Sequence, residues 1–81
     1  MQKVEIRLSL AENVKTFVNI VNKYEFGMDL RAGRHVVDAK SILGIFSLDL
    51  SKPITLEIDD DKNVSAERIT KLMEDIKPFI A

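Results

Sequence analysis

The stretch at residues 38–50, DAKSILGIFSLDL, decides how the middle of this 81-residue chain folds. Ser41 is a favourable helix N-cap, and residues 42–48 are enough for about two turns of helix. The segment is short for a surface helix and carries several large apolar side chains. Two interpretations are therefore open. Either Ser41 only caps a helix that fills the core, or Ser41 and the apolar residues together form a docking site.

On the N-terminal side of this stretch, the period of the apolar residues changes twice. Residues 4–8 alternate between apolar and charged side chains, which predicts a strand with one buried face. The apolar residues that follow have the spacing of an amphipathic helix: Val14, Phe17, Val18 and Val21. Ser9 and Glu12 have the spacing of a capping box, so Ser9 is expected to cap this helix after a short turn. Residues 26–39 alternate on both sides of Gly33 and predict a hairpin.

On the C-terminal side, Pro53 is expected at the start of a fourth strand, because a proline fits only the start or the edge of a strand. The residues of that strand expected to face inward are Ile54, Leu56 and Ile58. Ser65 is expected to cap a last helix that ends at Pro78. The buried stripe of that helix is Ile69, Leu72, Met73 and Ile76. The order β-α-β-β-α-β-α predicts an α+β layer fold, with one domain over residues 1–81.

The composition excludes several classes of function. A formal net charge of -1 provides no strong field, so neither nucleic acid nor a membrane is an expected partner. There are no cysteines, which excludes disulfides and thiolate metal sites. No segment has the roughly 18 consecutive apolar residues of a membrane span, and the N-terminus lacks a signal-peptide pattern, so we expect a cytoplasmic protein. Asp59, Asp60 and Asp61 are successive turn residues, which rarely converge on one cation, so no metal site is expected.

Residues 39–45, AKSILGI, resemble the regulatory-serine motif of HPr, the histidine-containing phosphocarrier family of the sugar phosphotransferase system. The chain length and the order of elements also resemble this family. Residues 16–24, TFVNIVNKY, stand where its first helix would be. The resemblance implies an open-faced sandwich, in which three helices cover one face of a four-stranded antiparallel sheet.

This chain differs from the family in the loop that carries the phosphoacceptor histidine. Here residues 7–17 read RLSLAENVKTF, and Leu10, Glu12 and Asn13 fall where the family has histidine, arginine and proline. A phosphohistidine requires an imidazole nucleophile, and Glu12 would repel the phosphoryl group. We therefore expect no phosphocarrier activity, no catalytic residue, no cofactor and no enzyme. The only histidine, His35, is expected to be half exposed on an edge strand, remote from the first helix.

The resemblance makes Ser41 a candidate site of regulatory phosphorylation. A phosphoserine at a helix N-terminus places nearly two negative charges beside free N–H groups, so the fold should tolerate it. Lys40 adjoins Ser41 in the sequence and is expected to neutralise part of that charge. Ser41 can be both a helix N-cap and a site of regulatory phosphorylation, so both interpretations stay open.

The apolar residues around Ser41 divide into two sets on a short helix. The set expected to point into the core is Ala39, Ile45, Leu48 and Leu50. Ile42, Leu43 and Phe46 are expected to face outward, on the side where HPr-like proteins bind partners, with Phe46 as the main anchor. An exposed apolar cluster of this kind usually marks an interface.

These features together resemble the catabolite-repression subgroup of the family, which keeps the serine and has lost the histidine. The expected function is that of a non-catalytic regulatory or adaptor protein. Its partner-binding surface would comprise Lys40, Ile42, Leu43 and Phe46 beside Ser41. The resemblance implies two partners, an HPr kinase/phosphorylase acting on Ser41 and a catabolite-control transcription regulator. The alternative is a structural or assembly module without a phosphorylation role, for example a homodimer joined through residues 42, 43 and 46.

Overall fold

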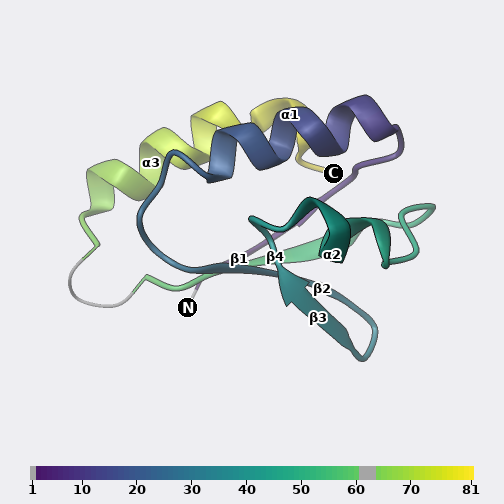
Figure 1. The fold of residues 1–81 in the computed structure, drawn as a ribbon. Helices are drawn as coiled ribbons and strands as arrows, with labels where there is room; N and C mark the ends of the chain where they lie inside the picture. Colours follow the sequence, from purple (N-terminus) through teal and green to yellow (C-terminus); the bar gives the residue numbers. More distant parts are fainter. Residues whose placement is uncertain (1, 61–63) are drawn as a thin grey trace.

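A computed structural model describes residues 2–60 and 64–81 as one sheet with helices on one side of it (Figure 1). Its elements are β1 (Gln2–Ile6), α1 (Ala11–Val21), β2 (Met28–Ala32), β3 (His35–Asp38), α2 (Ile42–Phe46), β4 (Ile54–Ile58), α3 (Ala66–Asp75) and the 3₁₀ turn η1 (Lys77–Phe79). The order of strands and helices is the one that the sequence predicts.

The sheet has four antiparallel strands in the order β1-β4-β2-β3. Strand β4 lies between β1 and β2, so those two run parallel to each other and α1 crosses the sheet to join them. Strand β3 pairs only with β2 and forms an edge. Helices α1 and α3 lie side by side over the same face of the sheet, with α2 beside them above β2 and β3 (Figure 1). The predicted open-faced α+β sandwich is confirmed.

The hairpin between β2 and β3 turns at the predicted glycine. Ala32 pairs with His35, so the loop has two residues, Gly33 and Arg34. Gly33 has φ 61°, which is a left-handed backbone conformation that favours glycine. A positive φ at the first loop position is the type II′ geometry, whose twist matches that of the flanking strands.

The core fills the space between the sheet and the helices. The strands contribute alternate residues to it, and the predicted inward side chains of β4 are all buried. The helices contribute the predicted stripes, with Val18 and Met73 only partly buried. The rings of Phe17 and Phe79 meet edge to face at 6.0 Å, which joins α1 to η1. The largest fully buried side chains are Phe17, Ile6, Leu8, Leu30, Ile45, Ile54, Leu56, Ile58, Leu72 and Ile76.

The predicted capping box at the start of α1 is wrong. The helix begins at Ala11, and its N-cap is Leu10, which makes no side-chain cap hydrogen bond. Glu12 is then the second helical residue, whereas a capping box needs its glutamate at the third position. By contrast, Ser65 caps α3 as predicted, since its Oγ accepts a hydrogen bond from Arg68 N at 3.2 Å.

Two predicted boundaries also shift. Strand β1 ends at Ile6 rather than Leu8, although Leu8 is buried. Helix α3 ends at Asp75 and not at Pro78, which lies within η1. A proline disfavours α-helical geometry for the residue before it, so the α-helix ends before Pro78. The predicted turn after β4 includes residues 61–63, which lie outside the described residues.

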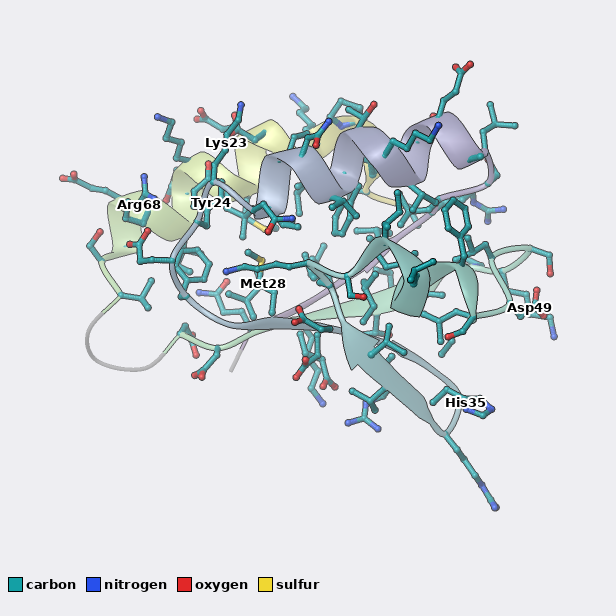
Figure 2. The ribbon with its side chains drawn as sticks, viewed as in Figure 1. Lys23, Tyr24, Met28, His35, Asp49 and Arg68 are labelled. Atoms are coloured by element: carbon teal, nitrogen blue, oxygen red, sulfur yellow. The ribbon has the colours of Figure 1, made fainter. Side chains whose placement is uncertain are left out.

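The connection between α1 and β2 is bound to α3 through Tyr24 (Figure 2). Tyr24 is 3% exposed, and its hydroxyl donates a hydrogen bond to Asp75 Oδ2 at 2.5 Å. The guanidinium carbon of Arg68 lies 4.7 Å from the centroid of the Tyr24 ring, and Arg68 Nη2 donates to Glu25 Oε2 at 2.8 Å. Burial, followed by the hydrogen bond to the Asp75 carboxylate, raises the pKa of Tyr24 to about 12.

The ionisation of Tyr24 can be followed by ultraviolet absorbance, because the chain has one tyrosine and no tryptophan. We expect tyrosinate to form near pH 12 in the folded protein and near pH 10 in the unfolded chain. The folded-state pKa is the higher one, so the stability that Tyr24 contributes is complete below pH 10 and is lost as the pH rises through 12.

Asp75→Asn should move the native transition toward lower pH, whereas Glu12→Gln, which removes a carboxylate elsewhere, should leave it unchanged. Circular dichroism at each pH would establish that the protein is still folded. A native transition at pH 10 would contradict the buried contact between Tyr24 and Asp75.

Candidate functional site

Ser41 is the N-cap of α2, as the sequence predicts. Its backbone is extended, with φ -104° and ψ 111°, and its Oγ accepts a hydrogen bond from Gly44 N at 3.2 Å. Its carbonyl accepts from Ile45 N at 3.1 Å, the first bond of the helix. The side chain is half-buried. The hydroxyl therefore has a structural role and is not sealed inside the protein.

The turn before Ser41 is fixed by local and sheet hydrogen bonds. Asp38 Oδ1 accepts a hydrogen bond from Lys40 N at 2.8 Å, and the Asp38 carbonyl accepts from Ser41 N at 3.0 Å. Ala39 is fully buried, and its N–H donates to the Met28 carbonyl at 3.0 Å. An aspartate that bonds to a backbone N–H two residues later is a common turn former. Asp38 and Ala39 thus determine where Ser41 stands at the edge of the sheet.

Lys40 ties this turn to the end of α1 instead of lying against Ser41. Its Nζ donates to the Tyr24 carbonyl at 2.5 Å, and its own carbonyl accepts from Asn22 Nδ2 at 3.3 Å. The ammonium group is therefore directed at the α1–β2 connection. The expectation that Lys40 neutralises charge at Ser41 does not match this arrangement, because the long side chain has a backbone acceptor in the opposite direction.

The apolar residues of α2 divide nearly as expected. Ala39, Ile45 and Leu48 are buried, and Leu50 packs partly against the core. Leu43 is 81% exposed and Phe46 is 45% exposed.

Ile42 departs from its expected outward position, since it is half-buried and packs against the core. Residues three apart on a helix share a face, so the burial of Ile45 draws Ile42 inward with it. Leu43, rather than the expected Phe46, is the most exposed apolar side chain of α2.

Gly44 lets α2 lie directly on the edge strand. A Cβ atom at this position would stand 3.3 Å from the Cβ of Val37 in β3 and 3.4 Å from Ser41 Oγ. A methyl group there would require Val37 to shift by a few tenths of an ångström. The glycine thus allows a close approach between α2 and β3.

Leu10 is an exposed apolar residue that the sequence analysis did not assign to the partner-binding surface. It is 61% exposed at the start of α1. Helix α2 contacts α1 and runs in the opposite direction (Figure 1), and the Asn22–Lys40 hydrogen bond holds the start of α2 near the end of α1. The end of α2, with Phe46, therefore points toward the start of α1. No sequence signal identified this exposure, because the N-cap was expected at Ser9.

Leu10, Leu43 and Phe46 are called the apolar surface below. They are three of the five large apolar side chains that are exposed among the described residues. The other two, Val36 and Ile80, lie on β3 and in the C-terminal segment. Apolar exposure in the described chain is thus concentrated on α2, beside Ser41, and on Leu10 at the start of α1.

The start of α1 carries no histidine. Leu10 occupies the N-cap, and Glu12 is the acidic residue of the first helical turn. His35 lies at the tip of the β2–β3 hairpin, where its side chain is exposed (Figure 2). It is on the edge strand, as predicted, and does not belong to the Ser41 site.

Within residues 2–60 and 64–81, no three acidic, histidine or cysteine side chains gather closely enough to hold a metal ion. Asp61, which was considered with Asp59 and Asp60, lies outside the described residues. No helix in these two ranges is long and apolar enough to cross a membrane.

The solved structures that are similar over nearly the whole chain include two HPr proteins. HPr-C-His from Thermoanaerobacter tengcongensis matches with a TM-score of 0.70 and 27% identity, over 94% of this chain and 90% of that one. The phosphocarrier protein HPr from Bacillus anthracis matches with a TM-score of 0.61 and 26% identity, over 91% and 92% of the two chains. A search of curated protein sequences found no match.

A family model described as the PTS HPr component phosphorylation site matches residues 10–75. The matched region begins at Leu10 and runs through the Ser41 turn and α2 to the end of α3. Because it includes most of the chain, and because the fold agrees with the solved HPr structures, the protein belongs to the HPr family of the phosphotransferase system.

Proposed function

We propose that the protein is a non-catalytic regulatory or adaptor member of the HPr family, whose working surface is α2 with Ser41 at its start. The observation that carries the proposal is the position of Ser41, half-buried and beside the exposed side chains of Leu43 and Phe46. The absence of a histidine from residues 7–17 supports it, because the first turn of α1 then has no phosphoacceptor. By its family, the protein would act in the cytoplasm without a cofactor.

Phosphorylation of Ser41 would change this surface without requiring a new fold. A phosphate oxygen can accept the hydrogen bond that Gly44 N now gives to Ser41 Oγ. Since Lys40 Nζ is bonded to the Tyr24 carbonyl, the added negative charge would not be neutralised by that neighbour. The phosphate would therefore be available to a cation of a partner protein, next to the apolar surface.

The modification is tested with an HPr kinase/phosphorylase and ATP. We expect the intact mass to increase by one phosphate, and fragmentation to place it on Ser41. Ser41→Ala should gain none. If the wild-type protein gained no phosphate, or if Ser41→Ala gained the same mass, regulatory phosphorylation of Ser41 would be excluded from the proposal.

The cap role of Ser41 gives a separate prediction about stability. Ser41→Ala removes the acceptor for Gly44 N and should lower the free energy of unfolding by about 1 kcal/mol in urea denaturation. Ser41→Asp should lower it much less, because aspartate is also a preferred N-cap. Equal losses in both variants would contradict the described cap.

Ser41→Asp also separates the two candidate functions, because it adds a charge while keeping the cap. The regulatory function predicts a changed affinity for the catabolite-control regulator with the fold intact. A structural or assembly module predicts little change. That second function is supported by the same apolar surface, which could join this chain to a larger complex or to a second copy. Light scattering over a range of concentrations would detect a homodimer.

Partner binding through the apolar surface is tested by replacing its side chains. Leu43→Ser and Phe46→Ser should each weaken binding of the regulator about tenfold or more in titration calorimetry, since exposed apolar anchors supply much of an interface's affinity. Val36→Ser is the matched control, because Val36 is 44% exposed and Phe46 45% exposed, but Val36 lies on β3. An equal effect of Val36→Ser, or no effect of the α2 variants, would contradict this surface. Leu10→Ser would show whether the surface extends to α1.

A further inference from the structure

A hollow of about 330 Å³ lies between the tip of the β2–β3 hairpin and the connection from α2 to β4. It is lined by Ala32, Gly33, His35, Asp49, Lys52 and Pro53. None of these residues belongs to the apolar surface or to the Ser41 turn. Figure 2 shows His35, on β3, and Asp49, in the connection from α2 to β4, at the same end of the molecule. Its size is at the small end of ordinary ligand sites.

Asp49 supplies a fixed negative charge. Its Oδ1 accepts hydrogen bonds from both Ser51 N, at 3.0 Å, and Ser51 Oγ, at 2.6 Å. These bonds hold the pKa of Asp49 below its ordinary value, so the group is ionised at neutral pH. Oδ2 makes no hydrogen bond to another residue in the described ranges. One carboxylate oxygen is thus oriented by Ser51 and the other is left for a ligand.

Lys52 supplies a positive charge that is not paired with Asp49. Within residues 2–60 and 64–81, its ammonium group forms no ion pair or hydrogen bond. The imidazole of His35 likewise has no hydrogen-bond partner in these ranges, and it can donate or accept. The hollow therefore holds two opposite charges that form no ion pair with each other, although the charge of Lys52 contributes to the lowered pKa of Asp49.

The remaining lining is apolar and open. Ala32 and Pro53 present aliphatic surface, and Gly33 leaves space, since a Cβ atom there would meet nothing within 4 Å. A phosphate dianion would be attracted by Lys52 and repelled by Asp49. A molecule with one charge of each sign and a short apolar part matches all three features.

We propose that this hollow binds a small zwitterion, namely a free α-amino acid. Its carboxylate would pair with Lys52, its ammonium group with Asp49 Oδ2, and its side chain would lie on Ala32 and Pro53. This inference does not depend on the proposed function of Ser41.

The test is a titration of the ¹⁵N-labelled protein with L-valine, followed by the amide resonances. Two comparison compounds each lack one charge of valine: isovalerate has no ammonium group, and isobutylamine has no carboxylate. We expect valine to shift the amides of residues 32–35 and 49–52 saturably. Each comparison compound should bind about tenfold more weakly, because each loses one charged hydrogen bond.

Two variants assign the charges to their partners. Asp49→Asn keeps an acceptor for Ser51 but should weaken valine binding about tenfold, whereas isovalerate, which Asp49 repels, should bind no more weakly than before. Lys52→Gln should weaken the binding of both valine and isovalerate. Lys71→Gln is the control, because Lys71 is an exposed lysine of α3 outside the hollow. The same spectra report whether each variant is folded.

Three results would overturn the proposal. The first is the absence of any saturable shift at residues 32–35 and 49–52. The second is isovalerate binding as tightly as valine, which would make the hollow a site for simple anions. The third is a set of shifts spread over all lysines and unchanged by Lys52→Gln, which would indicate nonspecific ion binding.

Discussion

Every helix of this fold covers the same face of one sheet, and α2 is too short to bury more than one of its own sides. In this five-residue helix, Ile45 is buried in the core and Ile42, on the same face, is partly buried. Leu43, on the other side of so short a helix, has no element to pack against. The exposed apolar side chains beside Ser41 therefore follow from the length of α2 and the burial of Ile45 together.

The place of α2 depends on contacts that are far apart in the chain. Gly44 allows the helix to rest on Val37 of the edge strand, and Asp38 and Ala39 hold the turn that precedes it. Lys40 then connects the same turn to the end of α1, where Tyr24 is bound to α3. A serine at this position is thus presented from a rigid support, which is what a modified or docking residue requires.

Membership of the HPr family gives the start of α1 its significance. Where the resemblance places the phosphoacceptor histidine, this chain has Leu10, which is exposed and cannot carry a phosphoryl group. The substitution removes a nucleophile and adds apolar area beside α2. A surface of that kind is suited to holding a partner, as the proposed function requires.

Local patterns in the sequence were sufficient for the type and order of the elements. The periodicities of residues 4–21 and 54–76, the glycine turn at Gly33 and the caps Ser41 and Ser65 depend on neighbours within four residues, so they could be predicted. The capping box at Ser9 failed because the start of α1 is set by packing of its buried stripe, and not by a capping side chain. The acceptor of Lys40, the inward turn of Ile42, the exposure of Leu10 and the hollow beside His35 were decided only by the tertiary structure. Each of them depends on residues brought together from distant parts of the chain, and a long side chain takes whichever partner the fold places within its reach.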